Sequence, residues 1–392
     1  MLHDETKTKF EIEHVLAGAE SAGRRTRLAN HNASPYNPSY CGDALFAAVA
    51  GRNIPPSDSP TIRDMTNASL VTNAPPSSDS LVVALAQLTP VWLDRDATIA
   101  KSVAAISDAA AQGAQLIAFP EGFAPGYPFW IERTNGALFN SPVQKALFAH
   151  YAREAVQIEA GHLAPIQDAA RRGGIAVMFG CIERPVDRGG HSVYASLVYI
   201  DAAGDIRSVH RKLVPTYEER LVWSPGDGHG LQVHALGPFT VGGLNCWENW
   251  IPMARAALYG LGEDLHVAVW PGSDYNTRDI TRFVARESRS YVMSVSSVMT
   301  CDDIPADVPH RDLIVAGGAP LLANGGSCIA SPDGTWLVEP VVDTERVILA
   351  TVAHRRVREE RQNFDPSGHY ARPDVLQLAV DRRRQTTVYV TD

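Results

Sequence analysis

From Leu81 onward, short apolar runs alternate with segments of helical spacing, and no other feature of the sequence constrains the fold as much. Residues 81–88 form an almost unbroken apolar run, which is typical of a strand buried on both faces. Residues 95–112 are rich in alanine, have helical spacing and end at Gly113, a helix stop signal. Because strands and helices alternate in this way over about 290 residues, we expect an α/β protein with helices packed on the faces of its sheets.

The same patterns place the remaining elements along the chain. We expect further helices at 142–157, 162–172, 252–260 and 278–289. We expect further strands at 115–119, 175–181, 193–200, 206–210, 239–245, 265–270, 291–298, 327–331, 335–338 and 346–352.

The two ends of the chain differ in composition from this central part. Residues 51–80 contain 17 Asn, Pro, Ser or Thr residues out of 30, and such a segment buries too little apolar surface to offset its ordering entropy. We therefore expect residues 1–80 to be a mostly disordered extension, with a targeting or docking arm as the alternative. Residues 81–381 form the predicted folded domain, and residues 382–392 a polar, peripheral tail.

Charge and cysteine content exclude several classes of protein. The net charge of −9 argues against a dedicated nucleic-acid binder, which would carry a basic patch. No run reaches 18 apolar residues and residues 1–10 lack the features of a signal peptide, so we expect no membrane association. The five cysteines are widely spaced without a Cys-x-x-Cys pair, which disfavours a disulfide scaffold and predicts a reducing, cytoplasmic setting. Cys181 and Cys328 lie in apolar strands and are expected in the core, whereas Cys301 lies in a polar loop with no evident partner.

Glu121 directly follows the predicted strand at 115–119, within the sequence Phe-Pro-Glu-Gly. A carboxylate at this point lies at the carboxyl edge of the sheet, where α/β proteins bind their ligands. Partly apolar surroundings there raise a carboxyl pKa toward the value that a general base needs. A solvated loop glutamate is the alternative interpretation.

Lys212 follows the predicted strand at 206–210, and Glu219 lies seven residues later, beyond a break marked by Pro215. This spacing lets Glu219 fold back toward Lys212 through the turn. A lysine held between carboxylates stays protonated and stabilises a developing anion. A run of surface charges is the alternative interpretation.

Cys246 stands where the predicted strand at 239–245 ends, and Pro252 suits the first turn of the helix that follows. Such a strand–turn–helix elbow presents a nucleophile beside backbone N–H groups. Those N–H groups and a neighbouring lysine predict that the thiolate, which is the nucleophilic form, is favoured. A buried, inert cysteine is the alternative interpretation.

Taken together and in this order, Glu121, Lys212 and Cys246 resemble the Glu-Lys-Cys triad of the nitrilase superfamily, the carbon-nitrogen hydrolases. The sequence looks most like the true nitrilase branch, which includes cyanide-degrading members. The matching phrases are FPEGFAPGYP at 119–128, HRKLVPTYEER at 210–220, WSPGDG at 223–228, GGLNCWEN at 242–249, HVAVWPG at 266–272 and GHYARPDV at 368–375. They are long and specific, and the resemblance covers about residues 81–381, which are therefore expected to form a carbon-nitrogen hydrolase domain.

The resemblance implies a four-layer αββα sandwich that associates across its outer helices into an αββααββα homodimer, which many members of the branch extend into spirals. It implies Glu121 as the general base, Lys212 as the cation that stabilises the tetrahedral intermediate, and Cys246 as the nucleophile. Glu219, in the phrase PTYEER, corresponds to the second glutamate of the family. Asn249 stands where many relatives carry histidine, and both residues occur in the family.

The implied activity is hydrolysis of an organic nitrile to a carboxylic acid and ammonia, through a thioimidate and a thioester on Cys246, without a metal or organic cofactor. The 13 histidines show no His-x-His or His-Glu-x-x-His spacing that would indicate a metal site. Tyr127, Trp130 and Trp247 are the expected substrate-binding residues, with simple packing as the alternative. Cyanide degradation and amidase or acyl-transfer chemistry are the alternative activities, and the complete triad disfavours a non-enzymatic filament scaffold.

Overall fold

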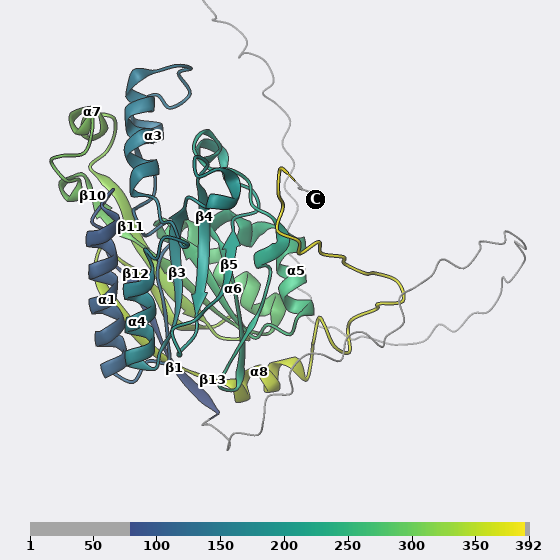
Figure 1. Cartoon of the computed structure of the whole chain (residues 1–392). Helices are drawn as coiled ribbons and strands as arrows, with labels where there is room; N and C mark the ends of the chain where they lie inside the picture. Colours follow the sequence, from purple (N-terminus) through teal and green to yellow (C-terminus); the bar gives the residue numbers. More distant parts are fainter. Residues whose placement is uncertain (1–78, 389–392) are drawn as a thin grey trace, which may run out of the picture. The chain divides into compact units, whose positions relative to one another are not determined.

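The computed structural model describes residues 79–388, which are built around two β-sheets (Figure 1). The first sheet has the strand order β13-β1-β2-β3-β4-β5, and the second has the order β10-β11-β9-β8-β7-β6 with β12 paired to β11. At the centre of each sheet three strands run parallel, β1 to β3 in the first and β7 to β9 in the second. The flanking strand pairs are antiparallel.

The strands of the first sheet are β1 (Ser80–Gln87), β2 (Leu116–Ala118), β3 (Ala176–Glu183), β4 (Tyr194–Ile200), β5 (Ile206–Arg211) and β13 (Arg346–Ala353). Those of the second are β6 (His234–Leu236), β7 (Phe239–Asn245), β8 (Leu265–Trp270), β9 (Tyr291–Ser296), β10 (Val298–Thr300), β11 (Leu321–Ala330) and β12 (Trp336–Val342). The α-helices are α1 (Arg95–Ala111), α2 (Trp130–Arg133), α3 (Pro142–Glu154), α4 (Ala164–Gly173), α5 (Pro252–Gly260), α6 (Asp274–Ser288), α7 (Arg311–Ala316) and α8 (His354–Arg361).

Strand β1 shows why its sequence is apolar almost throughout. Successive side chains of a strand point to opposite faces of the sheet. Val83 and Leu85 belong to the apolar cluster between the two sheets, whereas Ala84 and Ala86 belong to the cluster beneath the helices on the other face. The strand is therefore buried on both faces, as its composition predicts.

Helices cover the outer face of each sheet. On the first sheet α1 and α4 lie side by side, and they contribute Ile106 and Ile166 to the apolar cluster that includes Val177 of β3 (Figure 1). On the second sheet α6 contributes Ile280 and Val284 to the cluster that includes β8 and β9. The layers are thus helix, sheet, sheet and helix, and the predicted αββα sandwich is confirmed.

The elements that the sequence patterns miss are short or strongly charged. Helix α2 has only four residues and α7 has six, which is too little for a helical period to be recognised. Helix α8 buries only Val357 among charged neighbours, so its sequence carries no apolar stripe. Helix α6 begins at Asp274, four residues before the predicted start, and the strand predicted at 291–298 divides into β9 and β10.

The predicted disorder of residues 1–80 concerns residues that lie outside the described part of the chain, apart from Asp79 and Ser80, where β1 begins. The tail predicted after residue 381 is largely exposed, but it is not merely peripheral. The Nη1 atom of Arg384 lies 3.0 Å from Oδ1 of the buried Asp227, and the backbone N–H of Gln385 donates to Oδ2 of the same carboxylate at 3.0 Å. The tail is therefore fastened to the loop that follows β5.

No helix within residues 79–388 has both the length and the apolar character that crossing a bilayer requires.

Candidate active site

Glu121 lies in the short connection that follows β2, and its side chain is buried. Phe119 and Phe123 on either side of it pack against each other with ring centroids 5.5 Å apart, which anchors the connection in the core. The backbone N–H of Glu121 donates to the carbonyl of Trp270 at the end of β8, at 3.3 Å. The carboxylate from the first sheet is therefore held directly against the second sheet.

Lys212 is the first residue after β5, and its ammonium group lies between two buried glutamates. Its Nζ is 2.9 Å from Oε1 of Glu121 and 2.7 Å from Oε2 of Glu219. Glu219 belongs to the 3-10 helix η3 (Tyr217–Leu221), and its Oε2 also accepts the backbone N–H of Thr216 at 2.6 Å. The predicted fold-back of Glu219 onto Lys212 is thus present.

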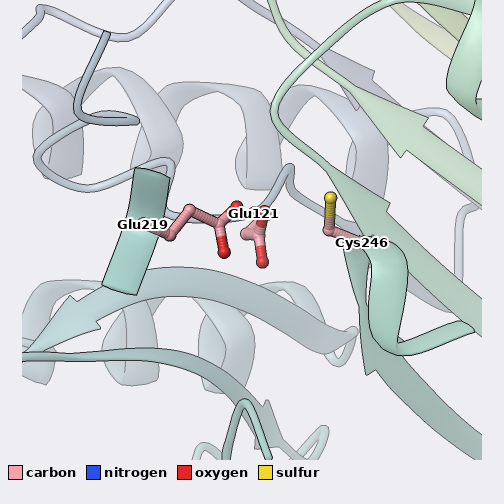
Figure 2. A group of neighbouring side chains, drawn as sticks. All are labelled: Glu121, Glu219 and Cys246. Carbon is pink, nitrogen blue, oxygen red and sulfur yellow. The ribbon is translucent and has the colours of Figure 1, made fainter. Parts of the chain in front are cut away.

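Cys246 begins the 3-10 helix η5 (Cys246–Trp250) directly after β7, so the predicted strand–turn–helix elbow is present. Its φ angle of 49° lies in the left-handed region that residues other than glycine rarely adopt. Strained backbone of this kind gathers at functional sites. Figure 2 shows the side chains of Glu121, Glu219 and Cys246 pointing toward one another from three separate segments.

The pKa values of these groups follow from burial and from one another. Burial raises the pKa of Glu121 to about 8, although the nearby Lys212 ammonium acts to lower it. Burial alone would lower the pKa of Lys212, but attraction to Glu121, Cys246 and Glu219 raises that pKa above its ordinary value. Lys212 therefore stays charged, whereas Glu121 is poised to take up or release a proton near neutral pH.

The prediction that the thiolate of Cys246 is favoured in the resting site is wrong. Burial raises the pKa of Cys246 well above its ordinary value, and the negative charge of Glu121 raises it further. The Lys212 ammonium and the backbone N–H of Trp247 act in the opposite direction without overcoming these effects. The resting group is therefore a thiol, and it becomes a strong nucleophile only when a base removes its proton.

The donor atoms of Glu121, Glu219 and Cys246 lie within 4.8 Å of one another, close enough together to surround a metal ion. However, the Lys212 ammonium already pairs with both carboxylates. The positive charge that a metal would bring to this donor set is therefore supplied by the chain itself.

The three residues predicted to bind substrate lie in different surroundings. Tyr127 donates its hydroxyl to Oε1 of Glu219 at 2.9 Å and approaches Oε1 of Glu218 at 3.2 Å. Trp130 is fully buried and packs edge-on against Tyr151, with ring centroids 4.6 Å apart. The side chain of Trp247 is 45% exposed.

Two further residues, Glu248 and Trp223, contact the site and were not predicted as site residues from the sequence. Glu248 accepts the backbone N–H groups of Asn245 at 3.0 Å and Leu213 at 2.8 Å, and it lies 2.8 Å from Nε2 of the buried His210. It therefore ties the end of β5 to the elbow after β7. The indole ring of Trp223 faces the Lys212 ammonium at 5.4 Å from its centroid.

The spacing of residues in the sequence does indicate the position of two glutamates, Glu219 and Glu248. Both Thr216-x-x-Glu219 and Asn245-x-x-Glu248 have the spacing of a capping box, in which the last side chain bonds back to the first backbone N–H. Recognising that pattern would have predicted that both side chains fold inward at the start of a helical turn.

Three further cysteines lie in the described part of the chain. Cys181 and Cys328 are buried, as predicted. Cys301 is a free thiol, and its sulfur is buried and lies 3.5 Å from Nη1 of Arg133.

A cavity of about 450 Å³ lies beside η3. Glu218, which contacts Tyr127, lines it, so the cavity lies next to the hydrogen bond between Tyr127 and Glu219. Its other lining residues are Ile131, Glu132, Asn135, Gly136, Ala137, Tyr217 and Leu221.

Comparison with known proteins finds relatives that span most of this chain. It is 35% identical to an aliphatic nitrilase from Rhodococcus rhodochrous, in an alignment that covers 79% of this chain and 82% of the relative. It is 34% identical to an arylacetonitrilase from Aspergillus kawachii, with 78% of this chain and 93% of the relative covered.

Solved structures share the fold at lower identity. A carbon-nitrogen hydrolase from Helicobacter pylori matches with a TM-score of 0.58 at 18% identity, covering 75% of this chain and 96% of that one. An amidase from a Nesterenkonia species matches with a TM-score of 0.52 at 20% identity, covering 72% of this chain and 94% of that one. The family model described as carbon-nitrogen hydrolase matches residues 82–362, and the chain belongs to the carbon-nitrogen hydrolase family.

Proposed function

We propose that this protein is a nitrilase, which hydrolyses an organic nitrile to the carboxylic acid and ammonia. The observation that carries the proposal is the Lys212 ammonium held between Glu121 and Glu219, with the Cys246 thiol beside them. The relatives named aliphatic nitrilase and arylacetonitrilase support a nitrile as the substrate.

In the first stage the Cys246 thiol attacks the nitrile carbon. Glu121 removes the thiol proton, since its pKa of about 8 suits proton exchange near neutral pH. The new carbon–sulfur bond turns one C≡N π bond into a lone pair on nitrogen, which takes up a proton and gives a thioimidate. Lys212 and the backbone N–H of Trp247 stabilise the negative charge that develops on nitrogen.

In the second stage water replaces nitrogen on the same carbon. Glu121 removes a proton from the water that adds to the thioimidate, and the protonated nitrogen leaves as ammonia to give a thioester. A second water, activated in the same way, attacks the thioester carbon, and the sulfur leaves as the Cys246 thiol. Two waters are consumed for each nitrile, and no metal or organic cofactor takes part.

The resemblance to the carbon-nitrogen hydrolases supports further proposals about residue roles, assembly, location and domain bounds. Glu219 keeps Lys212 charged, and Tyr127, Trp130 and Trp247 border the substrate site. The active form is a homo-oligomer that associates through the outer helices, because closed two-fold pairing is the commonest form of assembly. The setting is the cytoplasm, where a catalytic thiol stays reduced. The catalytic domain spans residues 81–381.

Release of ammonia from a panel of compounds tests the function. The panel contains phenylacetonitrile, mandelonitrile, benzonitrile, an aliphatic dinitrile and cyanide, with the matching amides run beside them. We expect acid and ammonia in equal amounts from at least one organic nitrile, and no product from Cys246→Ala. Turnover of amides without nitriles would indicate an amidase, and turnover of cyanide alone would indicate the cyanide-degrading alternative.

A further inference from the structure

A chain of three buried polar side chains ends at the backbone of Cys246. Asn249 of η5 donates from Nδ2 to the carbonyl oxygens of Cys246 at 2.8 Å and Leu244 at 3.3 Å. Its Oδ1 lies 2.7 Å from Nε2 of His266 in β8, and Nδ1 of His266 lies 2.9 Å from Oε1 of Glu263. The side chains of Asn249, His266 and Glu263 are all buried. None of the three belongs to the proposed acid–base chemistry.

The partners fix the direction of every hydrogen bond that the Asn249 side chain makes. Carbonyl oxygens only accept, so the NH₂ group of Asn249 must face the two backbone carbonyls and its oxygen must face His266. Nε2 of His266 must therefore carry a proton. On the other side of the ring, a carboxylate of Glu263 calls for a proton between it and Nδ1.

The surroundings suit this contact. A hydrogen bond between the imidazole of His266 and the carboxyl group of Glu263 gives both buried groups a partner, which lowers the cost of burying them. Gly242 leaves the room that the carboxylate needs, since a Cβ atom there would lie 2.2 Å from Oε1 of Glu263. Two guanidinium groups face backbone atoms of the chain, because Arg255 donates to the carbonyl of Asn249 and Arg361 donates to that of Glu263.

Another acidic group lies next to the chain in sequence. Asp264 follows Glu263 directly, but its Oδ2 pairs with Nε2 of His354 at 2.8 Å. It therefore has a histidine partner of its own.

The carbonyl that Asn249 holds belongs to the peptide bond between Cys246 and Trp247. A trans peptide is planar, so the carbonyl of Cys246 and the N–H of Trp247 turn together. The N–H of Trp247 is the backbone donor that acts on the Cys246 sulfur. The two bonds lie in this plane and point in opposite directions, so holding the carbonyl also fixes where the N–H points. The unusual φ angle of Cys246 makes such support necessary, because this backbone is strained.

We propose that Glu263, His266 and Asn249 are positioning residues that lock the Cys246–Trp247 peptide plane and so aim the Trp247 N–H at the charge developing on the substrate. The link to catalysis rests on the proposed nitrilase function. The three residues touch no reacting atom and act only through this backbone donor.

Two substitutions test, through kcat and KM, whether these three residues hold the Cys246–Trp247 peptide plane in place. Asn249→Asp keeps the shape of the side chain but places an oxygen against the two carbonyls, and His266→Gln removes the imidazole. We expect kcat to fall about tenfold to a hundredfold, because an oxyanion donor is misaligned, while KM changes by less than about threefold. The matched control is His354→Gln, which breaks a histidine–carboxylate contact of similar length outside the elbow and should keep the wild-type kcat.

A second measurement does not depend on activity. Protein labelled with ¹⁵N-histidine, with the His266 signal assigned in the wild type by its contact with the Asn249 side chain, should show a proton on Nε2 of His266 at pH 8. A His266 without a proton on Nε2 would overturn the inference, and this result decides the matter if the variants fail to fold. An active wild type with variants that keep kcat within twofold would also overturn it. An inactive wild type would instead overturn the proposed function.

Discussion

The two sheets contribute unlike halves to the candidate site. The first sheet supplies charged groups, since Glu121 follows β2 and Lys212 follows β5, and their positions are set by ion pairs that include Glu219. The second sheet supplies Cys246, whose position is set by a strained backbone and by hydrogen bonds to its own carbonyl. Side-chain ion pairs therefore position the charged groups of the first sheet, whereas the main chain positions the proposed nucleophile of the second sheet.

Glu248 accepts hydrogen bonds from both halves. Its carboxylate accepts from Leu213 beyond the first sheet and from Asn245 at the end of the second. The proposed proton transfer from Cys246 to Glu121 depends on the distance between the two halves, and the hydrogen bonds of Glu248 help to set this distance. Substitutions in the first-sheet half, in the second-sheet half and at Glu248 should therefore differ in how much they lower kcat and in whether they also change the pH profile or the Tm.

The largest effect is expected at the nucleophile. Cys246→Ala should lower kcat by about 10⁴-fold or more while the fold is kept, because a buried Cys→Ala change removes little volume. Glu121→Gln and Lys212→Ala should lose activity to a similar extent, since residues that act as one unit are not additive. Ammonia release with circular dichroism checks this, and Cys181→Ala should retain near wild-type activity. Full turnover by a folded Cys246→Ala protein would show that Cys246 is not the nucleophile.

The pH dependence of kcat/KM tests the role of Glu121 in the first-sheet half. Below the pKa of about 8, the Glu121 carboxyl holds a proton and cannot accept one from the thiol. We therefore expect kcat/KM to rise with pH, to reach half of its maximum near pH 8 and to level off about one pH unit higher. The residual activity of Glu121→Gln should lack this rise. A wild-type profile that is flat from pH 6 to pH 9 would contradict the assignment of Glu121 as the base.

Glu248→Gln should uncouple the halves without removing a reacting group. An amide places its NH₂ against backbone donors, so we expect kcat to fall about a hundredfold with a lowered Tm. Burial alone would raise the pKa of Glu248, but His210 and the two backbone N–H groups lower it. The carboxylate thus stabilises the fold above its unfolded pKa, and that stability is lost as the pH falls through the lower folded value. The Tm of wild type and variant should therefore converge in acid, and a constant difference down to pH 3 would contradict this.

In the first-sheet half, Tyr127→Phe should lower kcat less than Glu121→Gln or Lys212→Ala does. Burial raises the pKa of Tyr127 well above its ordinary value, so the hydroxyl stays a donor to Glu219. Its loss removes one hydrogen bond to a charged group, and we expect kcat to fall about tenfold. A rise in KM with an unchanged kcat would instead favour direct binding of substrate by the tyrosine.

The smallest effect on activity is expected at the tail. Arg384→Ala leaves the buried Asp227 without this guanidinium, and we expect Tm to fall by about 2–5 °C with less than a twofold change in kcat. Arg372→Ala is the matched control, because its ion pair with Asp374 is exposed and contributes little. Equal Tm values for the two variants would show that the tail is not fastened through Arg384.

Much of the fold was predictable because apolar periodicity reports burial directly. Strand β8 and helix α5 have the bounds that the pattern predicts, whereas the charged helix α8 gives no such signal. The proximity of Glu121, Lys212 and Glu219 was predictable from strand ends and a short turn. The resting thiol of Cys246 was not, since its pKa depends on burial and on charges brought from the other sheet. The contact between His266 and Asn249 joins residues of different elements, and no spacing in the sequence indicates it.

The covalent bond proposed between Cys246 and the nitrile carbon is tested most directly by mapping the trapped intermediate. The protein is mixed with a nitrile that it hydrolyses, quenched in acid during turnover, digested and analysed by mass spectrometry. We predict an acyl group on the peptide that contains Cys246, and none in Cys246→Ala. Turnover without this adduct, or an adduct on Cys301 instead, would contradict the account.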